Sequence, residues 1–114
     1  MKPIAAGTII TIFVGSSLFA ENWAPLKGAE IAEVLTDQTY QYEGAVQSFY
    51  ASGQTLYTAD RESWGRWRIE ADQYCSVWPP ASGWVCDDVA KDLDGDRIKF
   101  VGSSGFETIG WPAL

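Results

Sequence analysis

Two arginines and two tryptophans in the second half of the chain have residue types and a spacing that suit a ligand-binding face. Trp64, Arg66 and Arg68 alternate along one segment, and Trp78 ends the next one. Guanidinium groups orient anionic or sugar-like ligands, and indole rings supply flat surfaces against which such ligands pack. We therefore predict a ligand-binding site at Trp64, Arg66, Arg68 and Trp78.

The abundance of tryptophan also has a structural interpretation. Six Trp occur in 114 residues, and a small sheet can fill its core with a few large rings. This interpretation is favoured for Trp67 and Trp84. For Trp64 and Trp78 the structural and the ligand-binding interpretations both stay open.

Few catalytic chemistries are open to this composition. The sequence has no His and only two Cys, which excludes a Ser/His/Asp triad, a Cys/His pair and an ordinary zinc site. Glu70 and Asp72 lie close in sequence, but they flank a predicted turn and have no acid–base partner or nucleophile beside them. We therefore expect no catalytic residue, no metal and no cofactor.

The segment Asp92-Leu93-Asp94-Gly95-Asp96 has the alternating carboxylates of a calcium loop. It departs from the EF-hand pattern, because Gly stands at the fourth position instead of the sixth and Ser103 occupies the twelfth, where a Glu is required. A hairpin turn at Asp94-Gly95 leading into a strand over Arg97 to Val101 is the preferred interpretation. The neighbouring Asp87 and Asp88 add negative charge, and the calcium alternative stays open.

Length and charge restrict the class of protein. With 114 residues, of which 46% are hydrophobic, the chain has room for one compact core. Its formal charge of -7 opposes binding to a phosphate backbone. We expect a single small acidic domain that does not bind nucleic acid.

The first twenty residues have the pattern of an export signal. Lys2 gives a positive start, and residues 4–19 carry no charge. We predict a signal peptide over 1–20, cleaved after Ala20, and one β-rich domain over 21–114 that is periplasmic or secreted. A retained anchor is disfavoured, because the apolar stretch falls short of the roughly 20 residues of a span, so no stable membrane span is expected after processing.

Export would place Cys75 and Cys86 in an oxidising compartment, where such a pair forms a disulfide. The Pro and Gly residues between them predict a reversing loop that joins two short strands, with Val77 opposite Trp84. Closing this loop should contribute about 3 kcal/mol to stability. A redox-active pair is disfavoured because its usual Cys-x-x-Cys spacing is much tighter.

Hydrophobic periodicity predicts one short helix followed by strands. Lys27 to Leu35 carries Ile31 and Val34 on one side, although no Ser, Thr or Asp stands at the expected N-cap. From Thr39 onward the period is two, with frequent turn residues. The predicted strands are Thr39 to Tyr42, Ala45 to Tyr50, Thr55 to Thr58, Gly65 to Glu70, Tyr74 to Trp78, Trp84 to Val89, Arg97 to Val101 and Thr108 to Trp111. We expect a mainly β fold, a small antiparallel meander forming a curved sheet or barrel, with the helix at one end or edge.

The hairpin around residue 72 can be read in two registers. A three-residue loop, Ala71-Asp72-Gln73, sets Trp67 opposite Val77, whereas a two-residue loop sets Trp67 opposite Ser76. The three-residue loop is preferred, and it would bring Arg66 across from Trp78 for a cation–π contact. Its core face consists of Trp67, Ile69, Cys75 and Val77. Its other face consists of Arg66, Arg68, Glu70, Tyr74, Ser76 and Trp78.

Three motifs carry a resemblance to a known group of proteins. They are Ser63-Trp64-Gly65-Arg66-Trp67, Gln73-Tyr74-Cys75-Ser76-Val77-Trp78-Pro79-Pro80 and Trp84-Val85-Cys86. With the export signal and the short helix, this layout resembles a group of small exported bacterial proteins of unknown function. A looser similarity exists to small periplasmic β-barrels, both lipocalin-like binders and disulfide-tied inhibitors of lysozyme.

Two functions follow as expectations, and a third is weighed beside them. The first is a non-catalytic binding module for a small molecule or an envelope component. The second is a protein–protein partner, such as an inhibitor of an exported hydrolase, in which the acidic domain meets a basic cleft of a periplasmic protein. The third, an enzyme that uses Glu70 and Asp72, is disfavoured.

Overall fold

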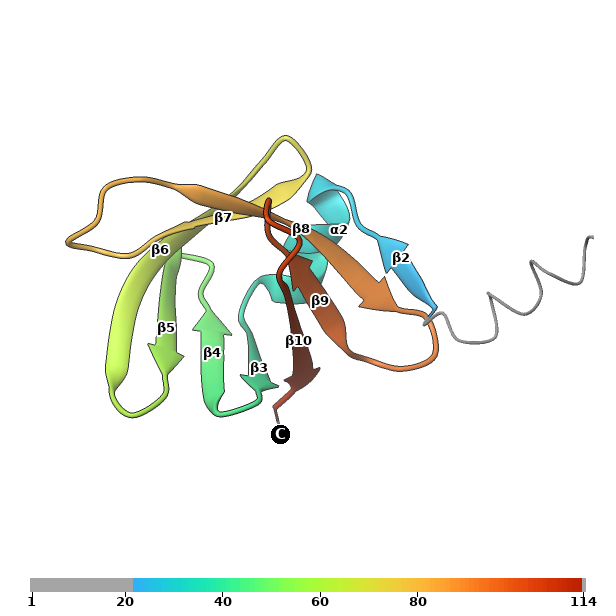
Figure 1. Ribbon diagram of the computed structural model, residues 1–114, viewed down its shortest axis with the longest axis horizontal. Coiled ribbons are helices and arrows are strands. Elements are labelled where there is room, and N and C mark those ends of the chain that lie inside the picture. Colours follow the sequence, from blue (N-terminus) through green and yellow to red (C-terminus); the bar gives the residue numbers. More distant parts are fainter. Residues whose placement is uncertain (1–21, 114) are drawn as a thin grey trace, which may run out of the picture.

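The computed structural model describes residues 22–113, so the predicted signal peptide lies outside the described residues. Between these limits the chain forms one short helix and nine strands (Figure 1). The elements are β2 (Trp23–Pro25), α2 (Gly28–Leu35), β3 (Gln38–Tyr42), β4 (Ala45–Phe49), β5 (Gln54–Thr58), β6 (Glu62–Glu70), β7 (Gln73–Val77), β8 (Val85–Asp92), β9 (Ile98–Val101) and β10 (Glu107–Pro112). No helix within 22–113 is long and apolar enough to cross a membrane.

Eight of the strands close into an antiparallel barrel. From β3 to β10 each strand pairs with the next, and β10 returns to β3, where Trp111 lies opposite Gln41. Strand β2 stays outside this ring and pairs with the second half of β8. The expected mainly β fold with one short N-terminal helix is confirmed, and of the two forms that the pattern allowed the sheet takes the closed one.

The strands form where the period-two pattern predicts them. In β4, for example, Ala45, Gln47 and Phe49 are buried while Val46 is exposed, because successive side chains of a strand point to opposite faces. The largest differences are β2, which was not among the predicted strands, β6, which begins at Glu62, and β8, which continues to Asp92. The alternation therefore fixes which side chains enter the barrel.

The two ends of the barrel are built differently (Figure 1). Helix α2 packs against β3, β6 and β7, and its Ile31 and Leu35 are fully buried in one cluster with Phe49 and Trp67. Antiparallel strands alternate in direction, so the connections β4–β5, β6–β7 and β8–β9 lie at this end and the other four at the opposite end. We name the end covered by α2 the closed end and the opposite one the open end.

The N-terminus of α2 is capped by a carboxylate from a distant part of the sequence. The Gly28 N–H donates to Oδ1 of Asp72 at 2.7 Å, and the Lys27 N–H donates to Glu30 at 2.9 Å. These oxygens satisfy N–H groups that have no partner within the helix. Asp72 thus attaches the helix to the β6–β7 turn, and Glu30 of the helix itself supplies the second acceptor.

The β6–β7 hairpin has the two-residue turn, so the predicted register was wrong. Glu70 pairs with Gln73, and both turn residues, Ala71 and Asp72, have positive φ angles of 50° and 61°. Positive φ at both central positions is the geometry of a type I′ turn, whose twist matches that of the strands it joins. The prediction failed because it chose the register that sets apolar residues opposite each other, Trp67 with Val77 and Ile69 with Cys75, whereas the chain pairs Trp67 with Ser76 and Ile69 with Tyr74.

The observed register exchanges the two faces of β7. Trp67 pairs with Ser76 and Ile69 with Tyr74, so Tyr74 and Ser76 face the interior of the barrel. Cys75, which was expected inside, lies on the outer wall and is nevertheless fully buried. Three side chains with polar groups, which the prediction had placed outside, therefore face the interior. They are Tyr74 and Ser76 of β7 and Trp78, the residue that follows this strand.

The predicted disulfide between Cys75 and Cys86 is present, and it joins residues that lie opposite each other on β7 and β8. Beside it, the Arg68 guanidinium lies 4.0 Å from the ring centroid of Trp84. Trp84 is therefore a half-buried residue of the outer wall and not part of the core, contrary to expectation. Trp67 is in the core as expected, and its Nε1–H donates to the Tyr50 carbonyl at 2.9 Å.

The Asp92 to Asp96 segment forms the predicted hairpin between β8 and β9. Oδ1 of Asp92 accepts the Asp94 N–H at 2.9 Å, and Oδ2 accepts Nε–H of Arg97 at 2.8 Å. The bond from Arg97, followed by the backbone bond from Asp94, holds the pKa of Asp92 below its usual range. Both oxygens of this carboxylate are therefore hydrogen-bonded within the turn that they stabilise.

Candidate functional site

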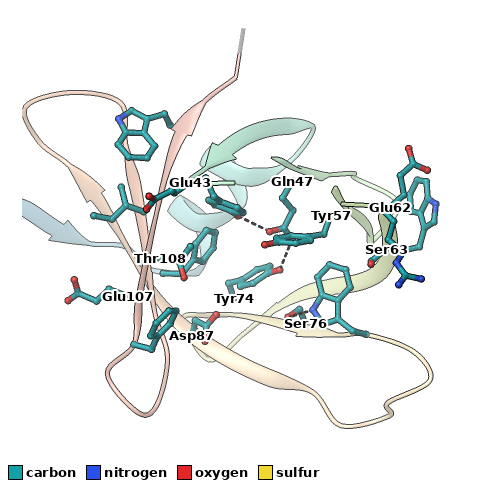
Figure 2. A pocket seen from close by; sticks show the side chains of 18 of the residues that line it. Glu43, Gln47, Tyr57, Glu62, Ser63, Tyr74, Ser76, Asp87, Glu107 and Thr108 are labelled. Carbon is teal, nitrogen blue, oxygen red and sulfur yellow. Dashed lines mark hydrogen bonds between the residues drawn. The ribbon is translucent and has the colours of Figure 1, made fainter. Parts of the chain in front are cut away.

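The open end of the barrel contains a cavity of about 1170 Å³. It is lined by inward side chains of the strands and by residues of the open-end connections, among them Glu43, Arg61, Pro79 and Phe106. Pockets that bind organic ligands enclose roughly 300–1,000 Å³. The cavity is thus large enough for a small organic molecule (Figure 2).

Five aromatic rings form a continuous lining, which we name the aromatic wall. Its members are Tyr42, Tyr57, Tyr74, Trp78 and Phe100. Neighbouring ring centroids are 6.1 Å apart for Tyr57 and Trp78, 6.3 Å for Tyr42 and Tyr57, and 5.0 Å for Tyr74 and Phe100. Tyr42 also meets Phe100 edge-on at 6.3 Å. Rings held in this way present a preformed apolar surface to a ligand.

Two glycines, Gly65 on β6 and Gly110 on β10, make room for this wall. A Cβ at Gly65 would lie 2.6 Å from a ring carbon of Trp78, and a Cβ at Gly110 would lie 2.8 Å from a ring carbon of Tyr42. Both distances are shorter than a van der Waals contact. The two rings can lie against the barrel backbone only because these positions lack side chains.

A hydrogen-bond network lies under the aromatic wall, with Gln47 at its centre. The Tyr42 hydroxyl donates to Oε1 of Gln47 at 2.7 Å. Nε2 of Gln47 donates to Thr55 at 2.9 Å and to the Tyr74 hydroxyl at 3.2 Å. Figure 2 shows Gln47 between the rings, with dashed lines for its bonds with Tyr42 and Tyr74. A buried amide with its partners in place fixes the positions of both tyrosines.

The buried tyrosines stay neutral. Burial is the largest cause that raises the pKa of Tyr42 and of Tyr74 above the usual value of 10.0. A neutral phenol can both donate and accept a hydrogen bond. The aromatic wall therefore offers polar contacts without carrying charge.

Asp87 places a carboxylate in the cavity. It lies opposite Tyr74 in the pairing of β7 and β8, so its side chain shares the inner face with that ring (Figure 2). Burial, followed by repulsion from Asp88, raises the pKa of Asp87. Asp88 itself points to the outer face, where its carboxylate accepts Nε2–H of Gln73 at 3.0 Å. The predicted negative patch is thus divided between the two sides of β8.

The other charged residues around the cavity lie at its mouth. Figure 2 shows Glu62 and Glu107 pointing away from the rings at its centre. Oε2 of Glu107 lies 3.6 Å from Nζ of Lys99 on the outer face. Arg61 is the basic residue of the lining. Among the lining residues, Asp87 is the acid that shares the inner face with the aromatic wall.

The four residues of the predicted ligand-binding site do not lie on one face. Trp78 belongs to the aromatic wall. Trp64 alternates with the inward Gly65 and Trp67 and so lies on the outer face of β6 with Arg66 and Arg68, 50% exposed, with its ring stacked on Tyr50. Arg66 lies opposite Val77, so the expected contact between Arg66 and Trp78 is wrong, and the two residues belong to different faces.

Arg68 likewise lies on the outer wall. Besides covering Trp84, it forms an ion pair with Glu70 at 3.2 Å. The part of Arg66 and Arg68 in ligand binding stays a prediction. Glu70 and Asp72, the carboxylates weighed for catalysis, have Arg68 and the Gly28 N–H as partners.

Sequence reasoning missed most of the lining, above all Gln47, Tyr57 and Asp87. One signal was present in the cysteines. If Cys75 and Cys86 pair on the outer wall, the period of two places Tyr74 and Asp87 on the inner face. The three-residue loop placed Cys75 on the core face, so the prediction put Tyr74 on the outer face. The two-residue turn places both residues as observed.

Comparison with known proteins adds no relative to this picture. The chain matched no protein-family model, no curated protein and no solved structure. The candidate function therefore rests on the geometry and chemistry of the cavity.

Proposed function

We propose that the protein is a non-catalytic binding module that holds a small molecule in the open end of its barrel. The single observation that carries this proposal is the cavity of about 1170 Å³ that is lined by five aromatic rings. A core built only for stability packs its interior to near crystal density and leaves few voids larger than a water molecule. A preformed apolar cavity with a few placed polar groups is the usual form of a ligand site.

The proposed place of action is the periplasm or the outside of the cell. The Cys75–Cys86 disulfide supports it, because such bonds persist in oxidising compartments. The ligand would then be a small molecule or an envelope component that reaches that compartment. The structural partners of Glu70 and Asp72 favour binding over catalysis at that turn.

Filling the cavity tests the proposal. Thr108 faces inward near the mouth, paired with Phe100, whereas Thr58 lies near the same end and faces outward, paired with Val46. The same substitution at both positions, Thr108→Trp and Thr58→Trp, adds an equal ring inside and outside. Nile red, a neutral dye whose fluorescence rises in apolar surroundings, serves as the probe on the oxidised protein.

We expect one dye per wild-type chain, a dissociation constant raised about tenfold or more by Thr108→Trp, and no change with Thr58→Trp. Thermal unfolding verifies that both variants fold. Equal binding by all three proteins would place the dye on the outer surface and refute the proposal. Absence of saturable binding to the wild type would do the same.

A protein partner is the second candidate. Trp64 and Val85, which are 50% and 62% exposed, supply apolar contact surface on an acidic chain. An inhibitor of an exported hydrolase would use such surface together with its charge. For this function, association with a purified hydrolase would be insensitive to Thr108→Trp and weakened by Trp64→Ala.

A further inference from the structure

The position of Asp87 bears on which ligand the cavity would accept. Its carboxylate is half-buried on the inner face, opposite Tyr74, and lines the same cavity as Tyr42. Across residues 22–113 no hydrogen bond or ion pair to this carboxylate is observed. Carboxylates removed from water are stabilised by an opposite charge, and without one their ionised form is disfavoured.

The surroundings of Asp87 suit a cation better than a neutral polar group. The faces of aromatic rings carry negative electrostatic potential and attract ammonium and guanidinium groups. Tyr74, Phe100 and Tyr42 line the cavity together with Asp87. The ring centroids of Tyr74 and Phe100 are 5.0 Å apart, and Tyr42 meets Phe100 edge-on. Arg61, the basic residue of the lining, comes from the β5–β6 connection at the mouth.

We infer that the cavity binds an organic cation, a protonated amine carried on an apolar or aromatic body, with the amine at Asp87 and the body against the aromatic wall. This inference rests on the proposed binding function. The acidic chain, with a formal charge of -7, adds a field that attracts cations and repels anions.

Three ligands of one shape and different charge test the inference by titration calorimetry at neutral pH. They are 2-naphthylmethylamine, which is protonated, 2-naphthylmethanol, which is neutral, and 2-naphthoate, which is anionic. The protein is the oxidised wild type and the variants Asp87→Asn and Asp88→Asn. Asp88 is a matched control, since it is the next residue and loses the same charge on the outer face.

We expect the amine to bind about tenfold more tightly than the alcohol, and the carboxylate more weakly than both. Asp87→Asn should bring the amine and the alcohol to similar affinity, whereas Asp88→Asn should keep the preference. Equal binding of amine and alcohol by the wild type would overturn the inference and leave the binding function standing. A preference that survives in Asp87→Asn would also overturn it. If none of the three ligands binds, the inference fails, and the Nile red titration decides separately whether the binding function stands.

Discussion

The closed and the open end of the barrel are made from the same strands, yet their interiors differ. At the closed end Phe49, Trp67 and the helix residues Ile31 and Leu35 fill the space and leave no exposed side chain among them. At the open end the inward side chains are rings and polar groups arranged around a cavity. The contrast teaches that one strand pattern can supply stability at one end and a binding surface at the other.

The largest effect is expected from removing a ring at the closed end. Phe49 is fully buried and meets Trp67 and Tyr74 at centroid distances of 5.8 and 5.7 Å. Phe49→Ala should lower the free energy of unfolding by about 3–5 kcal/mol, as measured by urea denaturation. The same change at the open end, Phe106→Ala, removes a ring that is 73% exposed and should cost less than about 0.5 kcal/mol. Similar losses in the two variants would erase the distinction between the ends.

The disulfide should have the next largest effect. It joins β7 and β8 on the outer wall, next to Tyr74 and Asp87, which line the cavity on the inner face. Replacing both cysteines, Cys75→Ser with Cys86→Ser, should lower stability by about 3 kcal/mol through loss of the cross-link. Urea denaturation of the double variant and of the oxidised wild type measures the difference. An unchanged unfolding midpoint would mean that the wall of the open end holds without the link.

Removal of the helix cap should have a smaller effect. Asp72→Ala deletes the acceptor for the Gly28 N–H and should cost about 1 kcal/mol or somewhat more, because residue 72 also has a positive φ. Asp72→Asn keeps an acceptor oxygen in a residue that tolerates this conformation, and most of the stability should remain. Thermal unfolding of the two variants checks the order. If Asn is as harmful as Ala, the carboxylate charge and not the cap holds α2 in place.

The smallest effect is expected at Asp87, with the opposite sign. Because its pKa is raised in the folded state, its contribution to stability is greatest below the unfolded pKa and is lost as the pH rises through the folded pKa. Asp87→Asn should therefore be slightly more stable than wild type at pH 7, and the difference should vanish in acid. Unfolding midpoints measured from pH 3 to 8 test this, with Asp88→Asn as the control. A loss of stability at pH 7 would assign Asp87 to the structure and not to the cavity.

The fold was predictable from the sequence to the level of its elements. Period-two burial, as in Ala45, Gln47 and Phe49, together with turn residues at short intervals located β3 to β10, and helical spacing located α2, whereas β2 was not predicted. Barrel closure depends on the pairing of β10 with β3, which are 65 or more positions apart and show no local sign of each other. The cap of α2 was likewise hidden, since Asp72 comes from a distant turn.

The site was less predictable than the fold, because one turn decides which side chains face inward. The longer loop was preferred because it pairs apolar residues across the hairpin, Trp67 with Val77 and Ile69 with Cys75, and the Ala71-Asp72 pair lacks the Gly that usually marks a type I′ turn. That choice placed Tyr74 and Ser76 on the outer face with Arg66. A shift of one residue in register exchanges the two faces of a strand, and here it concealed the cavity.

The most direct test of the account is to locate a bound ligand by NMR. The Trp side-chain N–H resonances of the isotope-labelled protein would be followed during titration with 2-naphthylmethylamine. We predict that the Trp78 signal shifts in a saturable manner, while the signals of Trp84 and Trp67 stay in place. Shifts confined to Trp84 and to the Arg66 and Arg68 side chains would place the ligand on the outer wall and contradict the account.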